Sequence, residues 1–188
     1  TGLSGGRRRF FSLLREEPQI GELLSMLAGR SQFLTRWLER RPELIDSLLD
    51  PTRLMEPRSV DDFAEEVRGI DWGAGLPAAC KQLRRLRRRE MLRVGLRDVA
   101  GLSDLHETAG ELTALAEAIL SAGVKAACEQ RLAGTSGLAA LAVGSFGGRE
   151  LHFSSDLDVV FGLDPERLPG SPEAASNAMR DLVRSFAE

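Results

Sequence analysis

The hydrophobic pattern of this chain is mostly helical. Between residues 19 and 39, apolar residues recur at spacings of three, four and seven, which predicts one amphipathic helix or two that break near Gly29 and Ser31. Ser59 and Ser103 precede further periodic stretches, where serine is a favoured N-cap. The proline-containing stretch at 51–59 is expected to be a loop. The pattern predicts further helices over residues 42–50, 59–67, 77–99 and 103–132, and from 171 onward.

The stretch LAVGSFGGRELHFSSDLDVVFGL, residues 141–163, departs from the helical pattern. Two short apolar runs, separated by glycines and polar residues, predict strands over residues 138–143 and 157–161. No other part of the chain predicts a strand convincingly. We therefore expect an α+β fold in which a helical region, residues 1–135, leads into a sheet-forming region, residues 136–188.

Two carboxylates lie at the start of the second predicted strand. Side chains at positions i and i+2 of a strand point to the same face, so Asp156 and Asp158 are expected to project side by side. Like charges this close repel each other unless a cation lies between them. Paired carboxylate oxygens suit Mg²⁺, which also binds substrate phosphates, so the pair is typical of half a phosphoryl- or nucleotidyl-transfer site.

The glycines upstream support the same interpretation. Gly144, Gly147 and Gly148 lack a Cβ, so their backbone N–H groups can approach a triphosphate, and the Ser145 hydroxyl can donate to a phosphate oxygen. A structural alternative is a strand–turn–strand unit with aspartates at a solvated strand end. We favour the catalytic interpretation because the phosphate-binding glycines and the paired carboxylates occur together.

Composition narrows the function classes. The net charge is −3, which is not the signature of a nucleic-acid-binding protein, and no apolar run approaches the roughly 20 residues that cross a bilayer. The two cysteines, Cys80 and Cys128, are too few for a disulfide framework and fit a reduced, cytoplasmic compartment. Both ends of the chain look cut from something longer.

An arginine-rich stretch, residues 81–93, leaves two interpretations open. It holds seven basic residues, with Leu83 and Leu86 at helical spacing between them. The stretch is either a patch for phosphate or an acidic partner, or the solvated face of a long helix, and we favour the second. Most of its arginines are then expected to face solvent: Arg84, Arg85, Arg87, Arg88, Arg89 and Arg93.

The motif GSFGGRELHFSSDLDVVF resembles the nucleotidyltransferase superfamily typified by DNA polymerase beta. Within it, the motif is similar to that of the bifunctional glutamine synthetase adenylyltransferase/adenylyl-removing enzymes, and the segment RSQFLTRWLERRPELIDSLLDP resembles a recurring upstream element of that family. The similarity covers most of residues 13–166. The motif matches at Gly144, Gly147, Gly148, Glu150, Leu151, Ser155, Asp156, Asp158 and Phe161.

The resemblance implies a nucleotidyltransferase that moves AMP from ATP to a tyrosine of glutamine synthetase, with Mg²⁺ on Asp156 and Asp158. It implies that Gly144, Ser145, Gly147 and Gly148 bind the phosphates and that Ser155 shapes the turn or touches the nucleotide. Glutamine synthetase and a PII-type signalling protein are the implied partners. Two alternatives remain: the adenylyl-removing domain of the same enzyme, or a catalytically incomplete helical module that binds these partners.

Two departures from the family pattern stand out. The family usually carries lysine where this chain has Ser145, although serine is what the wider superfamily uses. The superfamily also places a third carboxylate on a later strand, and nothing between Asp158 and Glu188 resembles that segment. Asp164, in a proline-containing turn, is a poor substitute.

Overall fold

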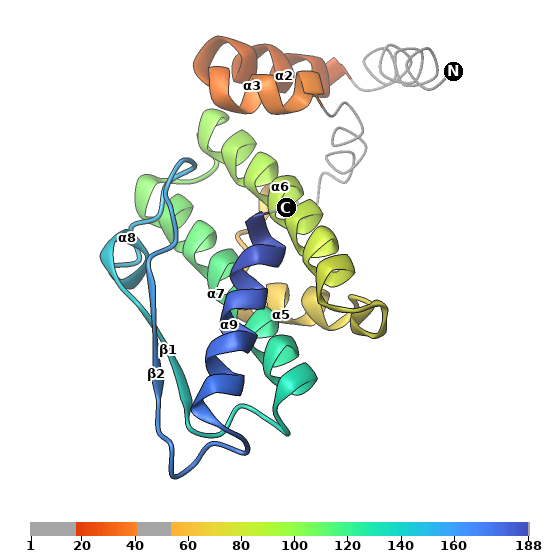
Figure 1. Ribbon diagram of the computed structural model, residues 1–188. Coiled ribbons are helices and arrows are strands. Elements are labelled where there is room, and N and C mark those ends of the chain that lie inside the picture. Colours follow the sequence, from red (N-terminus) through yellow and green to blue (C-terminus); the bar gives the residue numbers. More distant parts are fainter. Residues whose placement is uncertain (1–17, 41–53, 188) are drawn as a thin grey trace. The chain divides into compact units, whose positions relative to one another are not determined.

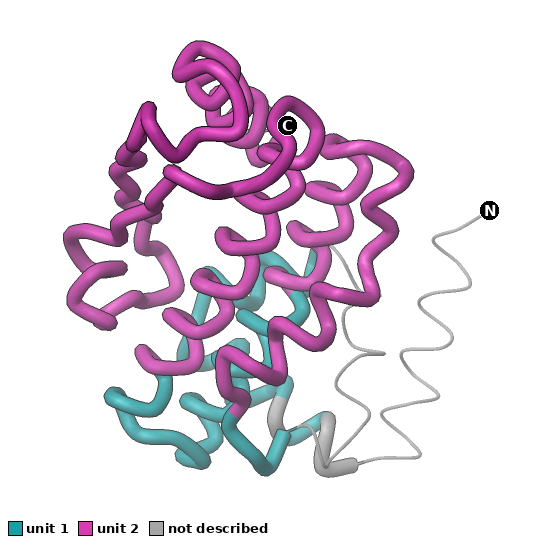
Figure 2. The backbone as a smooth tube through the Cα atoms, turned by 90° about the horizontal axis from the view of Figure 1, so that it is seen from below, with its two compact units in different colours: residues 1–57, 89–108 teal, residues 58–88, 109–188 magenta. Residues whose placement is uncertain are grey.

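The computed structural model describes residues 18–40 and 54–187, so the helix expected at 42–50 lies outside the described residues. The chain divides into two compact units, which Figure 2 colours separately. The first unit comprises residues 1–57 and 89–108, and the second comprises residues 58–88 and 109–188. Helices and one antiparallel pair of strands make up the described elements, which confirms the expected α+β class.

Two helices begin the first unit, α2 (Pro18–Arg30) and α3 (Gln32–Arg40). The break between them falls at Ser31, as the pattern predicted, and the Ser31 hydroxyl accepts a hydrogen bond from the backbone N–H of Leu34 at 3.3 Å. Leu34 is buried on α3 and packs onto Gly95, where the missing Cβ leaves the space that the leucine fills. One small residue thus lets a helix approach closely.

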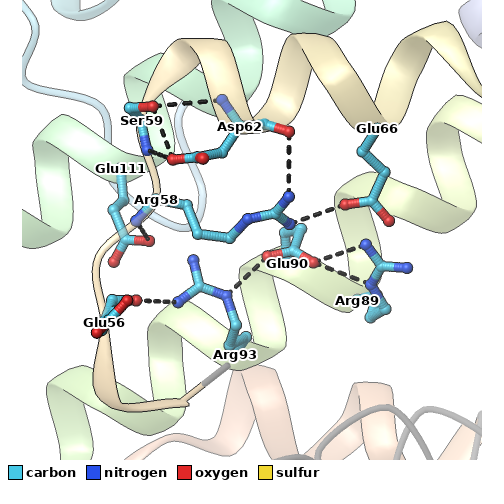
Figure 3. A network of polar contacts seen from close by, with 9 residues as sticks. All are labelled: Glu56, Arg58, Ser59, Asp62, Glu66, Arg89, Glu90, Arg93 and Glu111. Carbon is cyan, nitrogen blue, oxygen red and sulfur yellow. Dashed lines mark hydrogen bonds and ion pairs between the residues drawn. The ribbon is translucent and has the colours of Figure 1, made fainter. Parts of the chain in front are cut away.

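The first unit also buries charged side chains, contrary to the expected solvent-facing arginines. Helix α6 (Leu76–Val99) carries Glu90 and Arg93, which are both buried and pair at 2.7 Å (Figure 3). Arg97 is buried too, and it donates to the backbone carbonyl of Leu54 at 2.7 Å and to Glu107 at 3.1 Å. The prediction that Arg93 faces solvent is therefore wrong. Its pairing with Glu90 offsets the desolvation cost that would otherwise keep the side chain at the surface.

Other arginines of the α6 run behave as predicted. Arg85 and Arg87 are exposed, whereas Leu83 and Leu86 are buried. Arg84, Arg88 and Arg89 are partly exposed.

Helix boundaries follow their caps. In the second unit, Ser59 caps α5 (Val60–Arg68) as predicted, in a reciprocal capping box with Asp62 that Figure 3 shows. The hydrogen bonds from the Ser59 hydroxyl and backbone hold the pKa of Asp62 below its usual range. In the first unit, Asp104 rather than Ser103 caps α7 (Leu105–Arg131), because its carboxylate accepts from the N–H of Glu107 at 2.8 Å. The loop predicted at 51–59 is partly wrong, since Leu54 and Met55 are helical.

The core of the second unit joins parts of three helices with the sheet. A cluster of buried residues, including Cys80 on α6, Cys128 on α7 and Leu182 on α9 (Pro172–Ala187), contacts Leu138 and Phe161 of the strands. Helices α7 and α9 therefore lie against one face of the sheet, on the inner side of the hairpin in Figure 1.

The sheet is an antiparallel pair of β1 (Leu138–Ala142) and β2 (Val159–Leu163). In its register, Leu138 pairs with Leu163 and Ala142 with Val159. Between the strands lie the four-residue helix α8 (Gly144–Gly147) and a turn. In the described part of the chain, no helix has the length and apolar character that crossing a membrane requires.

Candidate functional site

The glycine segment forms a sharp turn from β1 into α8. Val143 is extended, and Gly144 takes a φ of 57°, in the left-handed region that favours glycine. Gly147 lies against β1, so that an added Cβ would stand 2.5 Å from the carbonyl oxygen of Ala142. Phe146 is buried and anchors the helix, whereas Ser145, Gly147 and Gly148 are exposed. The residues proposed to bind phosphate are therefore accessible.

Asp158 lies directly beside this turn. The backbone N–H of Val143 donates to the carbonyl of Asp158 at 3.0 Å, which continues the pairing of the strands by one residue. The carboxylate Oδ2 of Asp158 lies 2.9 Å from the position that a Cβ on Gly144 would occupy. Any side chain at residue 144 would displace this carboxylate. The structure thus brings together one predicted metal ligand and the first predicted phosphate-binding glycine.

The expectation that both aspartates lie within a strand is wrong. Strand β2 begins at Val159, so Asp156 and Asp158 both precede it. The reason is the missing partner: β1 ends where Gly144 turns into α8, and nothing remains for residues 156–157 to pair with. Both aspartates are exposed. Asp158 still joins the sheet through its carbonyl, whereas Asp156 lies in the preceding loop.

Asp156 has a cationic neighbour on α6. Desolvation by surrounding protein atoms lowers the pKa of Arg87, and the negative charge of Asp156 acts in the opposite direction and raises it. Arg87 thus adds positive charge on the Asp156 side of the candidate site, which a phosphate group would also favour.

Ser155 acts on the turn that leads to the aspartates. Its hydroxyl accepts from the backbone N–H of His152 at 3.0 Å, and its own N–H donates to the carbonyl of His152 at 3.0 Å. These bonds fix residues 152–155 and support the predicted role of Ser155 in shaping the turn. A contact between Ser155 and a nucleotide stays a prediction.

The candidate ligands are of the type that a hard cation prefers, but they are only two carboxylates. Asp156 and Asp158 offer the oxygen ligands that Mg²⁺ prefers. Across residues 18–40 and 54–187, however, no group of three His, Cys, Asp or Glu side chains is arranged to hold a metal ion. Cys80 and Cys128 offer no alternative, because burial raises the pKa of both thiols and keeps them protonated.

Sequence reasoning missed Arg149, the residue after the glycines. Its φ of 59° is the only positive φ of a non-glycine residue in the described part of the chain. Its N–H donates to the carbonyl of Phe146 at 3.2 Å, and its guanidinium lies 3.6 Å from Glu117 of α7. Nothing in its local sequence signals this conformation.

Comparison with known proteins identifies relatives of this chain. Residues 21–181 match the family model described as GlnE, glutamate-ammonia ligase adenylyltransferase. The chain is 31% identical over 168 residues to the bifunctional glutamine synthetase adenylyltransferase/adenylyl-removing enzyme of Shewanella woodyi. The alignment covers 82% of this chain and 18% of that relative, so the chain spans about a fifth of the relative's length.

Proposed function

Because the chain belongs to the GlnE family of glutamate-ammonia ligase adenylyltransferases, we propose that residues 136–188 begin a nucleotidyltransferase domain that transfers AMP from ATP to a tyrosine of glutamine synthetase. Glutamate–ammonia ligase is glutamine synthetase, so the family name and the relative's name agree on the target protein. The proposal also includes a tyrosine as the acceptor, a requirement for Mg²⁺, a PII-type partner and a cytoplasmic location. It includes the boundary after residue 135 between a helical region and the nucleotidyltransferase domain.

One observation carries the proposal: the carboxylate of Asp158 lies against Gly144, where β1 turns into α8. A phosphate chain that contacts the exposed backbone of residues 144–148 would therefore lie beside a carboxylate. Phosphates and a carboxylate repel each other unless a cation lies between them, which is the arrangement of a metal-assisted transfer site. Asp156, two residues earlier and also exposed, is the second candidate ligand.

Each element has a role in the transfer. The backbone N–H groups of the glycine segment and the Ser145 hydroxyl hold and orient the phosphates for attack by the acceptor hydroxyl. Asp156 and Asp158 would hold Mg²⁺, which supplies charge stabilisation for the phosphates when it is bound. Arg87 adds positive charge near Asp156. The turn fixed by Ser155 leads directly into the segment that carries both carboxylates.

The direction of the reaction has two candidates. The resemblance of residues 13–54 to the region that leads into the adenylylating domain favours that domain, because a long resemblance outweighs a few residues of a shared motif. The wording FSSDLD favours the adenylyl-removing domain instead. A catalytically incomplete module that binds glutamine synthetase is a further candidate, supported by Ser145 in place of the lysine that the family usually carries.

The test is a paired substitution in the full-length protein, Asp156→Asn with Asp158→Asn. We expect it to abolish AMP attachment to glutamine synthetase and to spare AMP removal, since each direction needs its own carboxylate pair. The assay follows AMP on glutamine synthetase, with ATP for attachment and phosphate for removal. Loss of removal alone would assign these residues to the opposite reaction, and retention of both would exclude a catalytic role.

A further inference from the structure

Arg149 occupies a backbone position that ordinarily belongs to glycine. Helix α8 ends in a Schellman motif, in which the N–H of Glu150 donates to the carbonyl of Ser145 at 2.8 Å. In the second bond of the motif, the N–H of Arg149 donates to the carbonyl of Phe146 at 3.2 Å. Glycine is the usual residue there, because the left-handed conformation brings a Cβ too close to the following carbonyl. Arg149 takes this conformation, with a φ of 59°, so its side chain must provide something that glycine lacks.

The ion pair that Arg149 makes does not offset this conformation. Its guanidinium lies 3.6 Å from the carboxylate of Glu117 on α7, and the two side chains are 62% and 47% exposed. Hydrogen bonds between charged groups are shorter, about 2.7 to 2.9 Å, so this pair is a loose one. Exposed pairs contribute little to stability. The arginine is therefore not explained by a gain in stability, and its guanidinium is accessible to an anion.

The space beside Arg149 has room for such an anion. Arg149 and the exposed Gly147 both line a cavity of about 570 Å³ between α7 and β1, within the range of ligand sites. Ala140 and Ala142 line it from the strand, and their short side chains leave this volume open. Lys125 of α7 adds a second positive charge to the lining. The guanidinium thus lies next to the glycine segment, residues 144–148, whose exposed backbone is proposed to contact phosphates.

We infer that Arg149 is a phosphate-binding residue, whose guanidinium exchanges the carboxylate of Glu117 for a phosphate group at the glycine segment. The inference rests on the proposed function, because it adds a side chain to the phosphate site proposed there. A guanidinium can donate two parallel N–H bonds to a phosphate, and the larger negative charge of a phosphate outcompetes a loosely paired carboxylate. The phosphate group belongs either to ATP or to free phosphate, and the two directions of the reaction distinguish these sources.

The test uses three single substitutions in the full-length enzyme: Arg149→Gly, Arg149→Lys and Glu117→Gln. The matched control is Glu129→Gln, which removes the same charge from another exposed carboxylate of α7, 3.9 Å from Lys125. Three quantities are measured for each variant: the KM for ATP in AMP attachment, the KM for phosphate in AMP removal, and the thermal unfolding midpoint.

We expect Arg149→Gly to raise the KM for ATP about tenfold and to leave the KM for phosphate unchanged, because one charge-assisted contact is lost at one site. Its unfolding midpoint should stay the same, since relief of the left-handed residue offsets the entropy that glycine adds to the unfolded chain. Arg149→Lys should raise the KM less, because lysine keeps the charge without the planar fork. Glu117→Gln should lower the KM about threefold by removing the competing carboxylate, and Glu129→Gln should leave it within about twofold.

A rise in the KM for phosphate instead of the KM for ATP would support Arg149 as a phosphate-binding residue and assign it to free phosphate. The inference would be overturned if Arg149→Gly left both KM values unchanged, or if it lowered the unfolding midpoint, which would give Arg149 a role in holding the fold. It would also be overturned if Glu117→Gln produced no fall in either KM. An unaltered enzyme that moves AMP in neither direction would overturn the proposed function and the inference together, whereas an active enzyme with an unaffected Arg149→Gly variant would overturn the inference alone.

Discussion

The two ends of the β1–β2 hairpin are built from the same pair of residue types and differ in what they offer to a ligand. At one end Gly137 has a φ of 72° and lies beside Asp164, and at the other Gly144 has a φ of 57° and lies beside Asp158. A Cβ on Gly137 would meet the backbone carbonyl of Asp164 at 2.7 Å. A Cβ on Gly144 would meet the carboxylate of Asp158 at 2.9 Å instead.

The partners of the two aspartates explain this difference. The Asp164 carboxylate accepts from the N–H of Glu166 at 3.1 Å and lies 3.4 Å from Arg167, so the local turn uses it. Within the part of the chain that the structure describes, no hydrogen bond or ion pair engages the carboxylate of Asp158. A glycine and an aspartate close a turn at one end, and at the other they leave an exposed carboxylate available for a ligand.

The largest effect on stability is expected at the end of the hairpin where Gly137 lies beside Asp164. Gly137→Ala would place a Cβ within 3 Å of the backbone of Asp164, Arg167 and Leu168, in a left-handed conformation that alanine disfavours. We expect a loss of about 3 kcal/mol in the free energy of unfolding, because backbone atoms cannot rotate away. Urea unfolding followed by circular dichroism measures it. A loss below about 1 kcal/mol would contradict the rigid turn.

Gly144→Ala should cost less stability and more activity. The new Cβ would meet a side-chain carboxylate, which can rotate away, so the remaining cost is the left-handed conformation, about 1 kcal/mol. The displaced Asp158 should lower AMP transfer by about tenfold or more, because small misplacements in a reacting site are costly. Unfolding and transfer are measured on the same preparation. Equal stability losses for the two alanine variants would contradict the comparison.

The smallest effect is expected from Asp164→Asn. The amide keeps an oxygen that accepts from the N–H of Glu166, and only the exposed pairing with Arg167 is lost. Exposed ion pairs contribute little, so the free energy of unfolding should fall by no more than about 0.5 kcal/mol. The same urea titration detects a larger change, which would show that the charge itself holds the turn.

The sequence was sufficient for most helices and for the class of the fold. The apolar period predicted the break at Ser31 and the long helices α6 and α7, because those helices bury leucines and alanines at helical spacing. The N-cap of α5 was predicted correctly, and that of α7 was predicted one residue too early. Ser103 and Asp104 are both good caps, and periodicity cannot choose between neighbours, whereas the bond to Glu107 does.

Two features depend on tertiary partners and could not be predicted from pattern alone. The length of β2 is set by where β1 ends, so the apolar pattern alone predicted a strand from residue 157, whereas β2 begins only at Val159. The burial of Arg93 depends on the pairing with Glu90, which is itself buried. A charged stretch was expected at the surface because unpaired burial is costly, and here the pairing removes that cost.

For the candidate site, the motif identified residues whose proximity only the structure provides. The spacing of Gly144 and Asp158 in the chain does not say that they touch, and the hairpin register brings them together. Arg87 and Arg149 were not assigned to the site beforehand, since neither the approach of α6 to Asp156 nor the left-handed backbone at residue 149 has a sequence signal.

The most direct test compares the two aspartates in the full-length enzyme, with Asp158→Asn and Asp164→Asn prepared as a matched pair. Both remove one charge from one end of the same strand. We predict that Asp158→Asn lowers kcat/KM for AMP transfer by about 100-fold or more in one direction, because a group that organises charge at the reacting phosphate is worth about this factor. Asp164→Asn should stay within about twofold of the unaltered enzyme, since its carboxylate serves the turn. Equal effects of the two substitutions, or full activity of the Asp158 variant in both directions, would contradict the assignment of the Gly144–Asp158 end as the site of transfer.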